Sequence, residues 1–322
     1  MYKVYDKWPE IAKNAYNQNI ELTRFSGIDH IVFAGMGGSG AIGDIFSSIL
    51  SKENIHVCVT KGYILPKTVD ANTLVVITSI SGNTIETLTV LNSAKKTKCK
   101  IIAFSSGGKI EEYCSKNRIE YRKIPKIHSP RASFTAFLYS MLKILDPVLH
   151  LEKNDVKESI TSLEKTNRLI SSDNLNQNNP SLELAEWITN IPIIYYPAGL
   201  QAAAIRFKNS LQENAKMHAM TEDVIEACHN GIVSWEMPSK VQPMLLRGID
   251  DYIKTKERWE ILKEYYKKKN INYKEIFSVE GNILSKLINL IYLLDYSTIY
   301  RAVLSGIDPS PIQSIDFIKN RL

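Results

Sequence analysis

Two stretches in the first half of the chain combine glycines and hydroxyl side chains in a way that suits anion binding. Residues 35–40 read GMGGSG, which satisfies the GxGxxG pattern, and residues 78–84 read TSISGNT. Each stretch follows a short apolar run and precedes a segment with helical spacing. Backbone N–H groups at the start of a helix converge on an anion. We therefore expect the first stretch to bind a phosphate.

The GxGxxG pattern alone does not identify the phosphate compound. A dinucleotide-binding loop also needs an acidic residue about 20 positions further on, at the end of the second strand, to bind the ribose hydroxyls. Here the second predicted strand, NIHVCVT, is followed by Lys61 and Gly62, so no carboxylate stands there. The sequence therefore favours a phosphate ligand other than a nicotinamide cofactor.

The second stretch carries more polar groups than helix capping requires. Ser79, Ser81, Asn83 and Thr84 lie within six residues, between an apolar strand and a predicted helix. A single hydroxyl is enough to cap a helix. The carboxyl ends of parallel strands are where α/β proteins bind their ligands. The group is therefore interpreted as an oxyanion pocket.

The order of predicted elements indicates an α/β fold built twice. Strands alternate with helices in the first half, a polar segment (SSDNLNQNNP) follows, and IPIIYYPAGLQAAAIRF then echoes HIVFAGMGGSGAIGDIF. Such alternation predicts a parallel sheet covered by helices on both faces. We expect two αβα sandwich domains, each with a central, mostly parallel sheet. Residues 1–150 would carry the phosphate loops, and 151–322 would form the second domain with a linking helix and a C-terminal tail.

Composition excludes several classes of protein. The net charge of +6 comes from scattered basic clusters near helix ends, so no nucleic-acid partner is expected. The longest apolar stretch, Leu287–Leu294, is interrupted by Asn289 and ended by Asp295, so no membrane span is expected. The N-terminus has no signal-peptide layout, and the four cysteines form no CxxC motif. Reduced thiols in a cytoplasmic protein are the expectation.

The pairing of GMGGSG with SISGNT resembles the sugar isomerase (SIS) fold, which binds phosphorylated sugars through these two loops. The resemblance implies that the phosphate of a sugar phosphate is bound by Gly38, Ser39, Ser79, Ser81 and Thr84. It also implies that the glycine loop serves a substrate and that the protein needs no cofactor.

Three later stretches resemble the bifunctional phosphoglucose/phosphomannose isomerases of archaea and some bacteria: SPRASFT, QENAKMHA and EACHNGIVSWE. With the C-terminal IDPSPIQSIDFIKNRL, the resemblance covers essentially the whole chain. It implies metal-independent interconversion of glucose 6-phosphate and mannose 6-phosphate with fructose 6-phosphate. Glu213 would move a proton between C1 and C2, His229 and Lys319 would serve ring opening, and Arg131 would stabilise the enediolate. Arg321 also lies near the end, so the choice between it and Lys319 stays open.

These residue types suit the chemistry, although each also has an ordinary structural interpretation. One carboxylate can take a proton from one carbon and return it to its neighbour, arginine can stabilise an oxyanion, and histidine can act as acid and base. Equally, Glu213 could be a solvated helix residue paired with Lys216, His229 could belong to a turn, and Arg131 could anchor a helix. Their joint occurrence in the family's order favours the catalytic interpretation.

Three other functions make demands that the sequence does not meet. A metal-dependent isomerase needs a ligand cluster, and the six histidines form no close pair at metal-ligand spacing. A sugar-phosphate sensor without catalysis would usually carry a DNA-binding domain, and no such pattern precedes His30. Glucosamine-phosphate synthase requires an N-terminal glutaminase domain with a terminal cysteine, and this sequence begins Met-Tyr-Lys.

Two further expectations come from the family resemblance. Ser310 stands near where relatives often have threonine, close to the sugar's C2, and this leaves the preference for glucose or mannose open. In the superfamily the ring-opening histidine reaches into the neighbouring subunit's site. The expected assembly is therefore a homodimer with shared active sites, in which His229 serves the partner.

Overall fold

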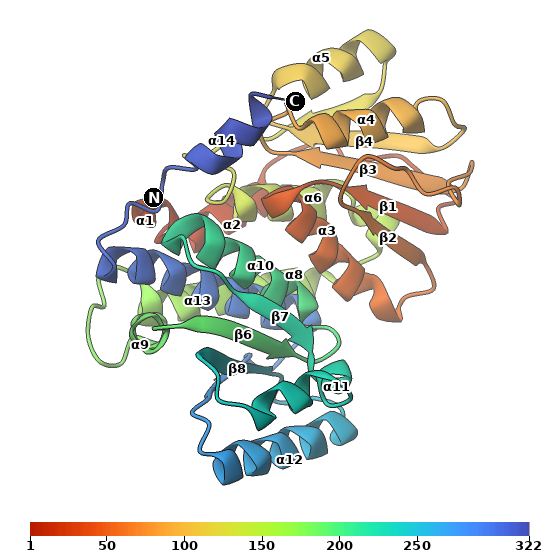
Figure 1. The fold of residues 1–322 in the computed structure, drawn as a ribbon. Coiled ribbons are helices and arrows are strands. Elements are labelled where there is room, and N and C mark those ends of the chain that lie inside the picture. The colour runs from red at the N-terminus through yellow and green to blue at the C-terminus, as the bar shows by residue number, and fades with distance from the viewer. Residues whose placement is uncertain (322) are drawn as a thin grey trace. The chain divides into compact units, whose positions relative to one another are not determined.

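The computed structural model describes residues 1–321 and divides into two compact units. One unit contains Lys3–Lys153 together with the C-terminal segment from Ser314, and the other contains Asn154–Gln313. Figure 1 shows one parallel sheet with flanking helices in each. The two units are described separately.

The first unit is built on a five-stranded parallel sheet in the order β2-β1-β3-β4-β5. Its strands are β1 (His30–Ala34), β2 (His56–Thr60), β3 (Thr73–Ser79), β4 (Lys100–Ser105) and β5 (Glu120–Lys123). All residues of β1 and β3 are buried, as their apolar, β-branched sequences require. β1 pairs with β2 on one side and β3 on the other. The chain therefore changes direction across the sheet at β1, and ligands of α/β proteins bind at such a switch point.

Alternate residues of these strands pack against helices on opposite faces. Val32, Ala34, Val75 and Ile77 share one core with α4 (Ile85–Ala94) and α5 (Gly108–Asn117). On the other face the Phe33 ring stacks on Phe46 of α3 (Gly37–Ile49), with ring centroids 4.8 Å apart. The remaining helices are α1 (Tyr2–Tyr5), α2 (Trp8–Asn17), η1 (Leu50–Lys52), α6 (Phe134–Ile144), α7 (Asp146–Leu149) and α14 (Gln313–Lys319).

The second unit repeats the plan with a four-stranded parallel sheet in the order β7-β6-β8-β9. Its strands are β6 (Ile191–Tyr196), β7 (Met220–Asp223), β8 (Val241–Arg247) and β9 (Lys274–Phe277). Its helices and turns are α8 (Lys153–Ile170), α9 (Pro180–Trp187), α10 (Gln201–Ser210), η2 (Leu211–Ala215), α11 (Val224–Ala227), η3 (Gly231–Glu236), α12 (Ile253–Lys269) and α13 (Ile283–Leu304). In Figure 1, α11 and α12 lie on one side of this sheet, while α10 and α13 lie on the other. The predicted pair of α/β domains with parallel sheets is confirmed.

The long helix α13 is the core helix of the second unit. By length and apolar composition alone it could cross a membrane, but 78% of its most apolar window is buried inside the structure. It also carries polar residues that are fully buried, including Asp295, Ser297 and Thr298. Apolar residues on most of its circumference are typical of a helix surrounded by protein.

Two histidines meet at the amino ends of β1 and β2, where His30 pairs with His56 in the strand register. Their rings stack with centroids 4.5 Å apart, and the side chain of His30 is buried. Burial lowers the pKa of His30 below its usual 6.5, and the nearby His56 lowers it further. Asp70 and Asp29 oppose this shift of the pKa but do not reverse it.

We predict that His30 makes the protein less stable in mild acid. Because its pKa is lower in the folded than in the unfolded chain, the unfolded chain binds more protons. The stabilising contribution is complete above pH 6.5 and is lost as the pH falls below that value. Calorimetric Tm values at pH 7.5 and 5.5 should differ less in His30→Gln than in the unaltered protein. His150→Asn, which changes an exposed histidine, is the control; equal pH dependence in all three proteins would contradict the prediction.

Candidate functional site

The glycine loop connects β1 to α3 and approaches β3 closely. A Cβ on Gly35 would lie 3.0 Å from the carbonyl oxygen of Thr78, so a glycine at this position favours the close approach of the two strand ends. Helix α3 begins at Gly37, and no side chain caps its first turn. The first N–H groups of a helix have no partner within it. This end of α3 is therefore suited to an anion, as the sequence predicts.

Three of the predicted phosphate-binding hydroxyls come together at the loop after β3. The Oγ of Ser79 lies 2.8 Å from Thr84 Oγ1 and accepts a hydrogen bond from the N–H of Gly82 (3.1 Å). Ser39, from the glycine loop, accepts from the N–H of Ile80 (3.2 Å). A hydroxyl that accepts from a backbone N–H still has its own proton to donate. Ser39 thus has a proton to donate, and so does one of Ser79 and Thr84, because only one of these two hydroxyls donates in the bond between them.

Two other hydroxyl residues of this loop, Thr84 and Ser81, are predicted to bind the phosphate. Thr84 occupies the N-cap position of α4, yet its side chain makes no capping bond. The Oγ of Ser81 accepts from the N–H of Asn83 (3.3 Å). The hydroxyl group at Thr84 is therefore not explained by helix capping, which supports the interpretation as an oxyanion pocket.

A third loop, Ser105–Lys109, supports the second, and sequence reasoning missed it. Ser106 Oγ donates to the carbonyl of Ile80 (2.7 Å), and the N–H of Lys109 donates to Asn83 Oδ1 (3.1 Å). Gly82 has φ +70°, and a Cβ there would lie 1.6 Å from the carbonyl oxygen of Gly107. The paired glycines of SSGGK were the available signal, because they allow this close contact.

Lys61 brings a positive charge to the glycine loop from the end of β2. Its Nζ lies 2.5 Å from Asp44 Oδ2 on α3, and its Cε would be 3.1 Å from a Cβ on Gly40. Burial raises the pKa of Asp44, while Lys61 acts in the opposite direction. The residue that stands in place of a ribose-binding carboxylate is therefore a cation that packs on the first turns of α3.

Arg131 lies in the same unit as the phosphate loops and is buried, with 6% of its surface exposed. The segment around it is fixed by Ser133, whose Oγ donates to the carbonyl of Ser129 (2.8 Å) and accepts from the N–H of Ile127 (2.8 Å). Trp8 Nε1 donates to the carbonyl of Ala132 (3.0 Å). A buried guanidinium in a rigid segment suits either an anchoring role or the stabilisation of an oxyanion.

Glu213 lies in the second unit, in the π-helical turn η2 that extends α10, and not on a regular α-helix. Its side chain is partly buried. Lys216, which ends the turn with φ +56°, donates from Nζ to the carbonyls of Glu213 (2.5 Å) and Pro311 (2.6 Å). The π turn is a finding that the sequence did not predict, and such turns are frequent at functional sites.

His229 is exposed in the turn that follows α11, in the same unit as Glu213. Asn230 Nδ2 donates to Glu226 Oε1 (2.6 Å), and a Cβ on Gly231 would lie 2.6 Å from Glu222 Oε2. Burial, and then the charge of Glu226, raises the pKa of Glu222. The HNG stretch is therefore a tightly held turn with an outward histidine, which is compatible with the predicted projection of His229.

Lys319 and Arg321 lie at the end of the C-terminal helix α14, which has no buried residues. The guanidinium of Arg321 covers the Phe317 ring at 3.5 Å, and its Nη1 donates to the Phe317 carbonyl (2.8 Å). Arg321, two residues beyond the end of α14, thus contacts that helix, and the assignment of Lys319 to ring opening stays a prediction.

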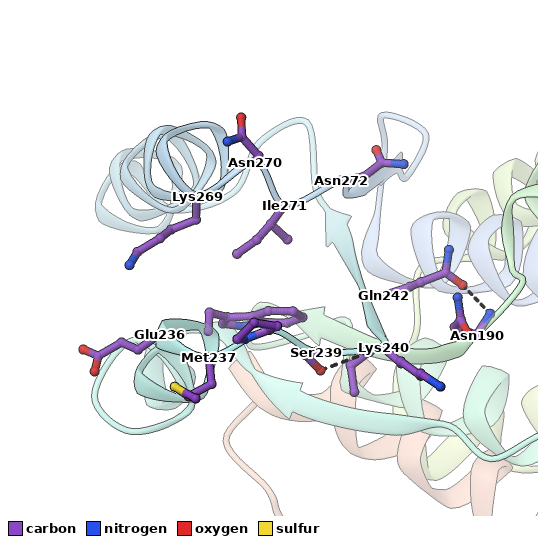
Figure 2. Close-up of a pocket in the computed structure, with 13 residues that line it drawn as sticks. Asn190, Glu236, Met237, Ser239, Lys240, Gln242, Lys269, Asn270, Ile271 and Asn272 are labelled. Carbon is purple, nitrogen blue, oxygen red and sulfur yellow. Dashed lines mark hydrogen bonds between the residues drawn. The ribbon is translucent and has the colours of Figure 1, made fainter.

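A cavity of about 450 Å³ in the second unit is lined by none of these residues (Figure 2). It lies at the amino ends of the strands, where Asn190 precedes β6 and Gln242 is the second residue of β8. The Gln242 side chain accepts from the N–H of Asn190 (2.6 Å). Lys269 and Asn270 border it from the end of α12. Ligands of α/β proteins bind at the opposite, carboxyl edge, so this cavity is not the predicted site. Among residues 1–321, no three His, Cys, Asp or Glu side chains are placed to hold a metal ion.

Comparison with known proteins agrees with this architecture. A family model described as SIS domain matches residues 25–143, and a model described as bacterial phospho-glucose isomerase C-terminal SIS domain matches residues 177–322. The C-terminal domain of glucosamine-fructose-6-phosphate aminotransferase from Francisella tularensis superposes with a TM-score of 0.71 at 17% identity, covering 95% of this chain and 96% of that one. That likeness shows the fold. The fold and the matched models define a protein with two SIS domains.

Two relatives that are similar over the whole chain show to which family of SIS-domain proteins it belongs. A bifunctional phosphoglucose/phosphomannose isomerase of Caldicellulosiruptor bescii is 31% identical over 100% of this chain and 98% of its own length. The enzyme of the same name from Aquifex aeolicus is 30% identical with the same coverage. The chain belongs to the family of bifunctional phosphoglucose/phosphomannose isomerases.

We predict that Gly82→Ala abolishes phosphate binding at the paired loops. The added methyl group would overlap the carbonyl of Gly107, so the second and third loops must separate. Gly27→Ala is the matched control, because Gly27 also has positive φ (+64°) but no atom lies within 4 Å of its would-be Cβ. Inorganic phosphate should raise the Tm of the unaltered protein and of Gly27→Ala, but not of Gly82→Ala. A normal phosphate-induced shift in Gly82→Ala would refute the loop assignment.

Proposed function

We propose that the protein is an aldose–ketose isomerase that interconverts glucose 6-phosphate and mannose 6-phosphate with fructose 6-phosphate. The observation that carries the proposal is the joined pair of phosphate loops, in which Ser39 bonds to the backbone of Ile80 beside Ser79 and Thr84. Full-length similarity to isomerases named for these two substrates supports the choice of hexose 6-phosphates. A cytoplasmic location is part of the proposal, and the four cysteines are free, as that compartment favours.

Phosphate binding fixes one end of the substrate. The hydroxyls of Ser39, Ser79, Ser81 and Thr84, with the N–H groups of Gly38 and its neighbours, would donate to the phosphate oxygens. Hydrogen bonds to a charged group contribute about 1.5–3 kcal/mol each. These contacts are the same for aldose and ketose, so they serve binding and orientation.

The proton transfer is assigned to Glu213. Its carboxylate takes the proton from C2 of the aldose and delivers it to C1 of the enediol, while the proton of the C2 hydroxyl passes to the oxygen at C1. The reverse reaction uses the same carboxylate. A single base on one face of the intermediate is sufficient for both steps. His229 and Lys319 would open the sugar ring by exchanging protons with the ring oxygen and the anomeric hydroxyl. Arg131 would stabilise the oxyanion of the enediolate. No metal ion is required for this route.

A binding protein without catalysis is the alternative. It would use the same phosphate loops and would have no need for Glu213 in its π turn. Turnover in a coupled assay for each aldose, in the presence of EDTA, separates the two. Tight binding of fructose 6-phosphate without turnover would establish the binding protein instead, and loss of activity with EDTA would show a metal requirement.

We predict that Glu213→Gln lowers kcat by at least about 10²-fold with little change in KM, because it removes the base and preserves the shape. Glu264→Gln, which changes an exposed carboxylate on α12, is the control and should keep full activity. Steady-state kinetics with fructose 6-phosphate measure both effects. If Glu213→Gln keeps most of its kcat, another residue is the base.

We also predict a homodimer in which His229 completes the site of the partner subunit. Glu213→Gln and His229→Ala should each be inactive, and mixing them under subunit exchange should restore activity. Random pairing makes about half of the dimers mixed, and each has one intact site of two, so about a quarter of the original activity returns. Subunit exchange is verified independently by mass spectrometry of a labelled variant. Absence of any recovery would place Glu213 and His229 of each site on one chain.

A further inference from the structure

The π turn that carries Glu213 is an irregular structure that must be held in place. Helix α10 ends at Ser210, and the chain continues through η2. Hydrogen bonds of this turn span five residues, as from the N–H of Lys216 to the carbonyl of Leu211. π-helical turns are rare and occur mostly as single turns. The turn ends at Lys216 in a left-handed conformation. Its shape therefore depends on contacts from outside the turn.

The first such contact joins the residue after Glu213 to the core helix α13. Asn214 is fully buried, and its Nδ2 donates to Thr298 Oγ1 (2.7 Å). Thr298 is also fully buried, and its Oγ1 donates in turn to the carbonyl of Asp295 (2.6 Å). The threonine hydroxyl thus has both a donor and an acceptor partner. Its orientation, and that of Asn214, is fixed.

A second contact holds the end of α10 one turn earlier. The buried carboxylate of Asp295 accepts from Arg206 Nε (3.0 Å) and Nη2 (2.6 Å), and from Ser210 Oγ (2.7 Å). Asp295 and Thr298 are three residues apart, so they lie on the same face of α13. A buried ion pair contributes little net stability, but its geometry is strict. Together the two contacts fix the rotation and the register of α10 and η2 against α13.

We propose that Asn214 and Thr298 are positioning residues for Glu213, an inference that rests on the proposed role of Glu213 as the base. Neighbouring side chains of a helical turn leave the backbone in directions that are fixed relative to one another. Anchoring Asn214 to α13 therefore determines the direction in which the Glu213 carboxylate leaves the turn. Neither positioning residue contacts the substrate; both act through the backbone of η2.

The required accuracy explains why such an anchor would matter. A base that serves C1 and C2 in turn must lie within hydrogen-bonding reach of both protons. A displacement of 1 Å can lower a rate about 10²-fold. Loss of the anchor should therefore appear in kcat, while KM, which depends on the phosphate loops of the other unit, should change little.

The test is Thr298→Val, which removes the hydroxyl and keeps the shape of the side chain. We expect kcat to fall at least about tenfold and KM to stay within about twofold. Thr298→Ser restores the hydroxyl and should recover most of kcat. Hydrogen exchange of the amides in residues 211–217 should accelerate in Thr298→Val and not in Thr298→Ser.

Thr166→Val is a matched control within the same unit. Thr166 lies on α8, is 4% exposed, and its Oγ1 accepts from Asn289 Nδ2 of α13 (2.8 Å). It therefore repeats the Asn–Thr bond to the same helix without contacting η2. We expect Thr166→Val to lower the Tm as Thr298→Val does, but to keep kcat and the exchange rates of residues 211–217.

The outcomes are distinct. Unchanged kcat in Thr298→Val, or an equal loss in Thr166→Val, overturns the positioning role while the isomerase function stands. An unaltered protein without isomerase activity refutes the proposed function, and hydrogen exchange then still decides whether Thr298 anchors η2. If Thr298→Val does not fold, Asn214→Ala removes the same bond from the donor side and is judged by the same measurements.

Discussion

The close approach of the β1 and β3 ends is the constraint on which the phosphate site depends. A Cβ on Gly35 would lie only 3.0 Å from the carbonyl oxygen of Thr78, so the absence of a side chain at position 35 favours this approach. That contact allows Ser39, at the start of α3, to reach the N–H of Ile80 at the end of the neighbouring strand. Ser39 and Ser79 are 40 positions apart in the sequence. Their hydroxyls therefore lie at the same edge of the sheet although they belong to different loops. A larger residue at position 35 would crowd both the Thr78 carbonyl and the backbone of Ser39.

The two units show how one topology can support different chemistry. Both sheets change direction at their first strand, and both place a helix after that strand. In the first unit the connection is glycine-rich and short, so the helix end is open to an anion. In the second, the corresponding helix α10 is extended into a π turn, and buried polar groups fasten its end to α13. The second unit thus has the same topology, but its buried polar contacts lie at the C-terminal end of α10, whereas the predicted phosphate site of the first unit lies at the N-terminal end of α3.

Much of this could be predicted from the sequence, because the relevant signals are local. Apolar β-branched runs predict the strands, and glycines between a strand and a helix predict the phosphate loop. The repeated order of elements predicts the two sheets. The π turn at Glu213 could not be predicted, because it has no local periodic signal. The bonds from Asp295 to Arg206 and from Thr298 to Asn214 join residues more than 80 positions apart. In the sequence of α13, Asp295 and Asn289 only interrupted an apolar stretch; the structure shows that they are partners of other helices.

The bond from Lys216 to the carbonyl of Pro311 affects how the protein can be engineered. The same ammonium group also donates to the carbonyl of Glu213, so one lysine side chain links the turn that contains Glu213 to the start of the C-terminal tail. Shortening the chain before position 311 would remove the bond from Lys216 to the Pro311 carbonyl. A shortened form of the protein should therefore keep every residue up to and including Pro311, so that Lys216 retains this bond to the tail.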